Sequence, residues 1–149
     1  ILAQSIIFVS GLYSRKRDLS PKQQAKLLNK KNVKVFKWND WEMARLEFTK
    51  NPNQKIILFS KGCRFAQSIS ESVKDKNHLK NIFIVEPYAA DKETRLSVKR
   101  AVELGVPERN VVVGQIKERG FGVVDNPTKT PKYKSHFGAI QFVSETFLR

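Results

Sequence analysis

Short runs of apolar residues alternate along the chain with segments in which apolar residues recur every three or four positions. The runs are typical of buried strands, and the three-to-four spacing is typical of helices. The runs predict strands at residues 5–10, 33–38, 55–59, 81–85 and 110–114, with 121–124 as a candidate short last strand. The helical spacing predicts helices at residues 20–30, 40–49, 65–73 and 91–105, and a closing helix that opens at His136.

Two of the predicted helices carry boundary signals. Ser20-Pro21 followed by Gln23 is typical of a helix start, with serine as the N-cap and proline in the first turn. Asp91 is a candidate N-cap for the helix that ends at Gly105, a residue type common just after a helix. These signals support the alternation of strands and helices.

The alternation of single strands with single helices favours one fold class. It is typical of α/β proteins with a mainly parallel sheet covered by helices on both faces. We therefore expect about five or six strands in a three-layer sandwich. The 149 residues suit one domain with a sizeable core, and neither a repeat nor a linker is visible, so we expect a single domain over residues 1–149.

The charge of the chain is the outlying feature of its composition. It has 28 Lys and Arg against 14 Asp and Glu, a formal net charge of +14. Such a charge favours anionic partners such as nucleic acid, anionic lipid or another acidic polymer, and a generally solvated basic surface is the alternative. The lysines are spread along the chain without an arginine-rich recognition helix, so sequence-specific reading of nucleic acid is not expected.

Other features disfavour several classes of protein. No segment approaches the roughly 18 apolar residues of a membrane span. Residues 1–9 lack the basic region and cleavage site of a signal peptide. The single cysteine, Cys63, excludes an internal disulfide framework and a cysteine-based zinc cluster. We expect a soluble protein without metal or cofactor, while its compartment and oligomeric state stay open.

The stretch around Ser60 carries the strongest candidate chemistry. Ser60 follows the apolar run 55–59 and precedes the predicted helix 65–73, and Gly62 comes two residues later. A serine on a sharp strand-to-helix turn is the arrangement of a nucleophile elbow, which lifts the hydroxyl out of the sheet and turns the next backbone N–H toward an oxyanion. The alternative is that Ser60 only caps the helix.

On these residues the chain resembles the α/β-hydrolase family. The family motif is Gly-x-Ser-x-Gly, and residues 58–63 read Leu-Phe-Ser-Lys-Gly-Cys. Ser60, Gly62 and the small Cys63 match, while Leu58 stands in place of the first glycine. The order of strands and helices is also similar to that of the family. The resemblance implies an α/β-hydrolase-like domain that hydrolyses an ester or amide through a Ser-His-acid triad.

The resemblance also implies roles for individual residues. Ser60 would be the nucleophile, and His136, just before the closing helix, would be the general base. The acid would be Glu118 or Asp125, because the family order is nucleophile, acid, histidine.

The resemblance further implies how the oxyanion is held and what is bound. The backbone amides of Leu12 and Lys61 would donate to the oxyanion. No cofactor would be needed, and the positive charge would favour an anionic substrate or a substrate displayed on an anionic surface.

A second hypothesis keeps the fold without the catalysis. The chain would then be a basic structural or polyanion-binding module in a larger assembly, such as a virion component or a ribonucleoprotein. Leu58, the short chain and the charge of +14 favour this hypothesis. His136 would be a histidine on the apolar face of the closing helix, and Glu118 and Asp125 would be surface charges. A third hypothesis, simple nucleic-acid binding, rests on the charge alone.

Overall fold

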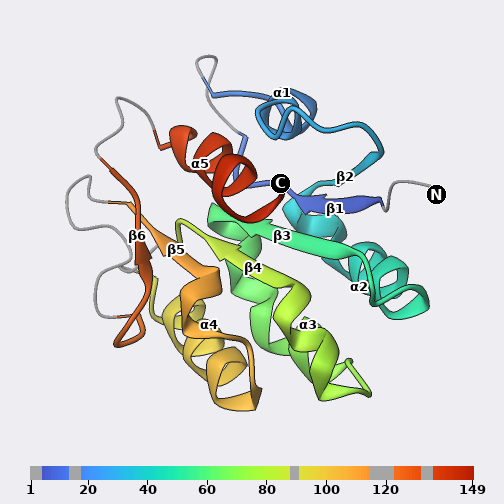
Figure 1. The fold of residues 1–149 in the computed structure, drawn as a ribbon, viewed down its shortest axis with the longest axis vertical. Coiled ribbons are helices and arrows are strands. Elements are labelled where there is room, and N and C mark those ends of the chain that lie inside the picture. The colour runs from blue at the N-terminus through green and yellow to red at the C-terminus, as the bar shows by residue number, and fades with distance from the viewer. Residues whose placement is uncertain (1–4, 14–17, 88–90, 115–122, 132–135) are drawn as a thin grey trace.

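The computed structural model describes residues 5–13, 18–87, 91–114, 123–131 and 136–149. Their strands form one six-stranded sheet in the order β2-β1-β3-β4-β5-β6, and every neighbouring pair is parallel (Figure 1). The prediction of a mainly parallel sheet is therefore confirmed. The strands are β1 (Ile6–Val9), β2 (Val33–Phe36), β3 (Lys55–Phe59), β4 (Ile82–Val85), β5 (Val111–Val113) and β6 (Thr128–Lys129).

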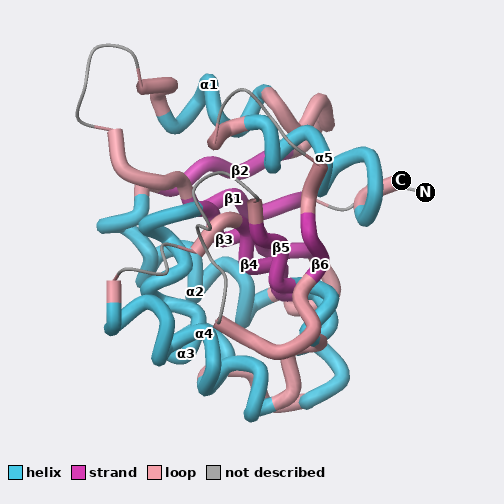
Figure 2. The backbone as a smooth tube through the Cα atoms, turned by 90° about the vertical axis from the view of Figure 1, so that its left-hand side faces the viewer, coloured by secondary structure: helices cyan, strands magenta, loops and turns pink. Residues whose placement is uncertain are grey.

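Helices cover both faces of the sheet, as predicted. Figures 1 and 2 show α1 (Pro21–Lys26) and α5 (Gly138–Phe147) on one side, and α2 (Trp41–Lys50), α3 (Ala66–Glu71) and α4 (Lys92–Leu104) on the other. Short 3-10 segments lie at Trp38–Asp40, Ser60–Phe65, Lys76–Asn81 and Glu108–Asn110. Within the described residues, none of the helices combines the length and the apolar character that crossing a membrane requires.

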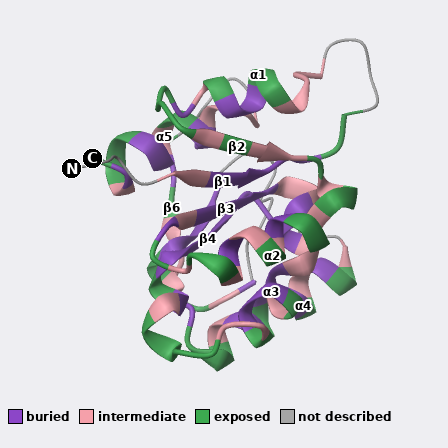
Figure 3. Ribbon diagram, turned by 90° about the vertical axis from the view of Figure 1, so that its right-hand side faces the viewer, coloured by how far each residue is buried: buried purple, intermediate pink, exposed green. Residues whose placement is uncertain are grey.

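The core lies in two layers because successive side chains of a strand point to opposite faces of the sheet. On one face, strand residues such as Ile7, Leu58 and Ile84 pack with residues of α2, α3 and α4. On the other face, strand residues such as Phe8 and Ile57 pack with α1 and α5. Figure 3 shows the central strands as buried and the outward faces of the helices as exposed. The near-continuous apolar runs are thus explained by burial on both sides.

Both predicted helix starts are confirmed. Ser20 forms a capping box, in which its hydroxyl accepts from the N–H of Gln23 at 3.2 Å and its own N–H donates to Gln23 Oε1 at 2.8 Å. The Asp91 carboxylate accepts from the N–H groups of Glu93 and Thr94 at the start of α4. Gly105 ends α4 with a φ of 131°.

Several boundaries differ from the sequence-based predictions. The helix predicted at residues 20–30 ends at Lys26, and the one predicted at 65–73 ends at Glu71. The last strand is β6 at Thr128–Lys129; of the predicted 121–124, the first two residues lie outside the described residues and the other two form a bend. A strand of two residues is too short to leave an alternation pattern. The closing helix begins at Gly138, not at His136. The segment after Ser60 starts as a 3-10 turn before α3 begins at Ala66.

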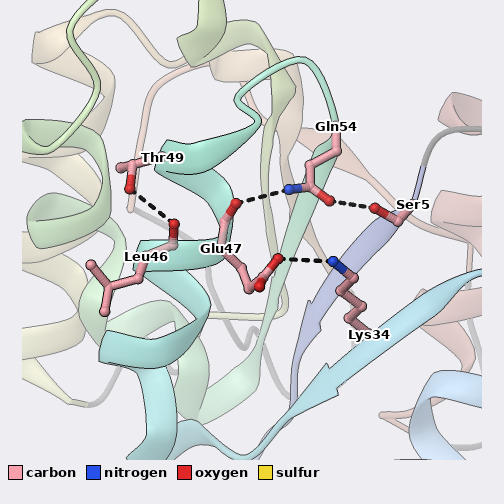
Figure 4. A network of polar contacts seen from close by, with 6 residues as sticks. All are labelled: Ser5, Lys34, Leu46, Glu47, Thr49 and Gln54. Atoms are coloured by element: carbon pink, nitrogen blue, oxygen red, sulfur yellow. Dashed lines mark hydrogen bonds and ion pairs between the residues drawn. The ribbon is translucent and has the colours of Figure 1, made fainter.

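A polar network ties α2 to the sheet (Figure 4). Gln54, which is almost fully buried, donates to the backbone oxygen of Glu47 at 3.0 Å and accepts from Ser5 Oγ at 2.6 Å. The Glu47 carboxylate pairs with Lys34 Nζ at 2.8 Å, and the hydrogen bond and charge of Lys34 lower the pKa of Glu47. The network joins α2, β2 and the segment that leads into β3.

Candidate functional site

Ser60 lies at the carboxyl end of β3, beside the end of β1. A Cβ added to Gly11 would lie 2.8 Å from Ser60 Cβ, so the segment that leaves β1 is in contact with Ser60. The chain runs from β1 to β2 on one side and continues from β3 toward the other edge of the sheet. In open α/β sheets this reversal opens a crevice at the carboxyl ends of the strands, where ligands bind.

The backbone of Ser60 has the left-handed conformation that an elbow requires, with a φ of 54°. A residue with a Cβ rarely adopts this conformation, because its side chain crowds the backbone. The N-cap of the following 3-10 segment is Phe59, and no side chain caps it. The Ser60 hydroxyl therefore does not cap the helix, and this alternative is wrong.

Gly62 allows the 3-10 segment to approach β1 closely. A Cβ at this position would lie 3.0 Å from Val9 Cγ1 and 3.1 Å from the Val9 backbone oxygen. The N-cap residue, Phe59, makes no side-chain hydrogen bond to the backbone N–H groups of the first turn of this segment. The Lys61 side chain turns toward Trp38, with Nζ 5.1 Å from the centre of the ring.

Trp38 also packs against other aromatic rings near this turn. Phe65 stacks on Trp41 with ring centres 4.7 Å apart, and its ring centre lies 6.5 Å from that of Trp38. All three side chains are partly exposed. They form an aromatic wall beside the turn that starts at Ser60.

His136 is paired with a carboxylate for which the sequence predicts no role. His136 Nδ1 lies 2.9 Å from Glu86 Oε2. Glu86 directly follows β4, and its side chain is 4% exposed. Its φ is 55°, and its backbone N–H donates to the backbone oxygen of Val112 at 2.7 Å. A buried carboxylate is therefore fixed at the carboxyl end of the strand beside β3.

The position of the Glu86 carboxylate depends on Gly114, at the end of β5. A Cβ on Gly114 would lie only 2.0 Å from Glu86 Oε1. This oxygen is buried and has no hydrogen-bond partner among the described residues. A buried carboxylate oxygen without a partner is costly, which is typical of a group retained for its chemistry.

The His136 ring packs against the residue that precedes Ser60. Its centre lies 4.8 Å from the centre of the Phe59 ring, and Phe59 is the residue immediately before Ser60. Within the described part of the chain, no hydrogen bond joins Ser60 Oγ to the imidazole. Hydrogen bonds between catalytic groups often tighten only when substrate binds, so this geometry is compatible with either hypothesis for His136.

Of the two acids expected from the sequence, Asp125 is not paired with His136 in the described structure. Asp125 is exposed, in the bend that precedes β6. Glu118 lies outside the described residues. The sequence did contain a signal for Glu86, because it is a carboxylate directly after a fully apolar run. Its pairing with a histidine 50 residues away in the chain is a tertiary contact that this run does not reveal.

The segment predicted to hold the oxyanion is anchored from α1. Gly11 N–H donates to Oε1 of the buried Gln24 at 3.0 Å, and Gln24 Nε2 donates to the backbone oxygen of Leu19 at 2.9 Å. Leu12, whose amide is the second predicted donor, directly follows this anchor and has an exposed side chain. The start of the loop after β1 is thus held in place next to Ser60.

Cys63 is a packing residue here. It is fully buried, and its Sγ lies within hydrogen-bond distance of the backbone oxygens of Leu58 at 3.2 Å and Val85 at 3.3 Å. Burial raises the pKa of the thiol, so the nucleophilic thiolate is disfavoured.

The described residues contain no group of three or more His, Cys, Asp or Glu that could hold a metal ion. Comparison with known proteins assigns no family to the chain. No family model matches it, and neither a curated protein nor a solved structure shows significant similarity.

Proposed function

We propose that this protein is a serine hydrolase of the α/β-hydrolase type, which cleaves an ester or an amide. The observation that carries the proposal is the positive φ of two residues, Ser60 and Glu86. Among the described residues, those other than glycine with a positive φ are Asn29, Asn32, Ser60 and Glu86. Asparagine adopts this conformation readily. The two that remain are the predicted nucleophile and the carboxylate that pairs with His136, each directly after a central strand.

Glu86 takes the acid role in this proposal, in place of Glu118 or Asp125. The order Ser60, Glu86, His136 along the chain keeps the order nucleophile, acid, histidine. The Glu86 contact at His136 Nδ1 fixes the ring and leaves Nε2 as the nitrogen that can accept a proton.

The chemistry follows from these positions. Ser60 Oγ attacks the carbonyl carbon of the substrate while its proton passes to His136 Nε2. The carbonyl oxygen becomes an oxyanion, which accepts hydrogen bonds from the backbone amides of Lys61 and Leu12. Glu86 stabilises the imidazolium.

The tetrahedral intermediate then collapses. The leaving group departs with the proton from His136, and the acyl group stays on Ser60 as an ester. Water then attacks the carbonyl carbon of this ester while giving a proton to His136. The bond to Ser60 Oγ breaks, His136 returns the proton to that oxygen, and the acid is released. The net charge of +14 favours an anionic substrate, or one displayed on an anionic surface.

The test is covalent labelling with a fluorophosphonate probe, which reacts with activated serines. We expect the wild type to be labelled, Ser60→Ala to lose all labelling, and His136→Ala to react at least about a hundredfold more slowly. Ser68→Ala is the matched control, because Ser68 is an exposed serine on α3, and it should label like the wild type.

Circular dichroism checks that each variant is folded. Absence of labelling in folded wild-type protein, or labelling that survives in Ser60→Ala, would contradict the proposal. The hypothesis of a basic module without catalysis would then take its place.

A further inference from the structure

Basic side chains surround three hollows that meet at Lys30. One hollow of about 510 Å³ lies between α1 and α5, a second of about 450 Å³ lies at the amino ends of β1 and β3, and a third of about 400 Å³ runs along α1 and β2. Lys30 lines all three. We call the basic residues that line them the basic surface: Lys22, Lys26, Lys30, Lys31, Lys55 and Arg149.

The charges of the basic surface are not neutralised within the described part of the chain. None of its six side chains forms an ion pair there, in contrast to Lys34, which pairs with Glu47, and Arg64, which pairs with Glu93. Glu145 is the one carboxylate among the residues that line the hollows. Like charges gathered without partners repel one another, and a bound anion would relieve that repulsion.

The turn that carries Lys30 and Lys31 is held at both ends. The backbone oxygen of Leu28 accepts a hydrogen bond from Ser144 Oγ of α5, which lies beside α1 (Figures 1 and 2). The backbone oxygen of Asn32 accepts from the N–H of Ile6 at 2.9 Å. A fixed backbone pre-organises the two lysines and lowers the entropy lost on binding.

Stabilisation of a helix end does not account for the basic surface. A lysine in the last turn of a helix interacts favourably with the helix dipole, which explains Lys26. Lys30 and Lys31 lie beyond the end of α1, and Lys55 begins β3. Lys55 Nζ lies 5.9 Å from the centre of the Phe83 ring, and for Lys30 and Lys31 the structure shows no such contact among the described residues.

We propose that the basic surface binds the phosphodiester backbone of a nucleic acid. Lysine ammonium groups act as point charges for phosphates, and adjoining hollows suit a flexible chain of phosphates. No aromatic side chain lines the hollows, so bases have nothing to stack on. The contacts would be to phosphates, which carry no sequence information, so binding should be independent of sequence.

A lipid surface fits these features less well. Binding at a membrane interface combines basic charge with apolar side chains that insert into the lipid. The large apolar side chains exposed among the described residues are Leu12, Tyr13, Met43, Leu46, Leu96 and Leu104, and none of them lines the hollows.

The test measures binding of a labelled mixed-sequence DNA strand of about 20 nucleotides as a function of salt. The variant combines Lys26→Gln, Lys30→Gln and Lys31→Gln. The control combines Lys76→Gln, Lys99→Gln and Arg100→Gln, which removes the same charge from exposed residues outside the hollows.

We expect the wild-type affinity to fall steeply with salt. Loss of three phosphate contacts should lower the slope of log K against log salt by about 2, and the affinity at low salt at least about tenfold. The control should bind within about twofold of the wild type. The proposal is overturned if the wild type does not bind the DNA strand, or if the control loses as much affinity for it as the variant does. It is also overturned if the wild type binds anionic lipid vesicles but not the DNA strand. None of these outcomes depends on whether Ser60 is active.

Discussion

At the scale of single residues, Ser60 and Glu86 hold a backbone conformation that costs of order 1–3 kcal/mol for a residue with a Cβ. Such a cost persists only where the surroundings dictate the conformation. At Ser60 the surroundings are β3 before it, Gly11 beside it and the turn toward Gly62. The strain at Ser60 therefore predicts a conflict between stability and function.

Replacing Ser60 by glycine should reveal this conflict. Glycine adopts a positive φ without steric cost, so Ser60→Gly should be more stable to urea than Ser60→Ala by up to about 1 kcal/mol. Both variants should lack fluorophosphonate labelling. Urea unfolding followed by circular dichroism compares the two. A glycine variant less stable than the alanine variant would show that the backbone at this position is not strained.

Replacing the Glu86 carboxylate by an amide should slow the reaction while the fold is kept. Glu86→Gln is nearly isosteric, but its amide cannot stabilise an imidazolium as a carboxylate does. The labelling rate should fall by about a hundredfold or more. Asp125→Asn is the control, because Asp125 is exposed, and its rate should stay at the wild-type value. The opposite pattern, with Asp125→Asn slow and Glu86→Gln unaffected, would return the acid role to Asp125.

At the scale of elements, the position of α4 depends on its first turn. The Asp91 carboxylate accepts hydrogen bonds from the Thr94 N–H and hydroxyl, and Arg64 pairs with Glu93, the second residue of the helix. Burial opposes ionisation of Asp91, but the hydrogen bonds from Thr94 and the charge of Arg64 outweigh it, so the pKa of Asp91 lies below its usual value. The cap is therefore strongest when Asp91 is charged.

Removing this cap should destabilise the protein in a pH-dependent way. Asp91→Ala should lower the free energy of unfolding by about 1 kcal/mol at pH 7. Since the pKa of Asp91 is lowered by folding, its contribution is present above the unfolded pKa of about 3.9 and is lost as pH falls through the folded pKa. Urea unfolding at several pH values should show wild type and variant converging in acid. If the free energies of unfolding of wild type and Asp91→Ala differed by the same amount at all pH values, the charge of Asp91 would not be what stabilises the cap.

The elements show where sequence patterns suffice and where they fail. The strands β1 to β5 and the caps at Ser20 and Asp91 follow from local patterns, because burial on both faces leaves apolar runs and caps need particular side chains. The two-residue β6 leaves no such pattern. The contact between Glu86 and His136 joins the end of β4 to the segment before α5. Only the tertiary fold brings these residues together.

At the scale of the whole molecule, the candidate active site lies at the opposite end of the sheet from the part of the basic surface formed by Lys30, Lys31 and Lys55. Lys55 begins β3, and Ser60 follows its last residue. Five strand residues at a rise of about 3.3 Å each separate the two ends by about 17 Å. This distance exceeds the Debye length of about 8 Å at physiological salt, so charges at the amino end of β3 are screened from the serine.

The two sites should therefore be separable by mutation. At physiological salt, the variant with Lys26→Gln, Lys30→Gln and Lys31→Gln should label with a neutral fluorophosphonate within about twofold of the wild-type rate, because screening removes their influence at this distance. Conversely, Ser60→Ala should bind the DNA strand as the wild type does. The labelling rate and the DNA-binding isotherm of the lysine variant and of Ser60→Ala, measured in one buffer, test whether the two sites are independent. If the lysine variant loses labelling while it stays folded, the basic surface and Ser60 act as one site, and the anion bound there belongs to the substrate.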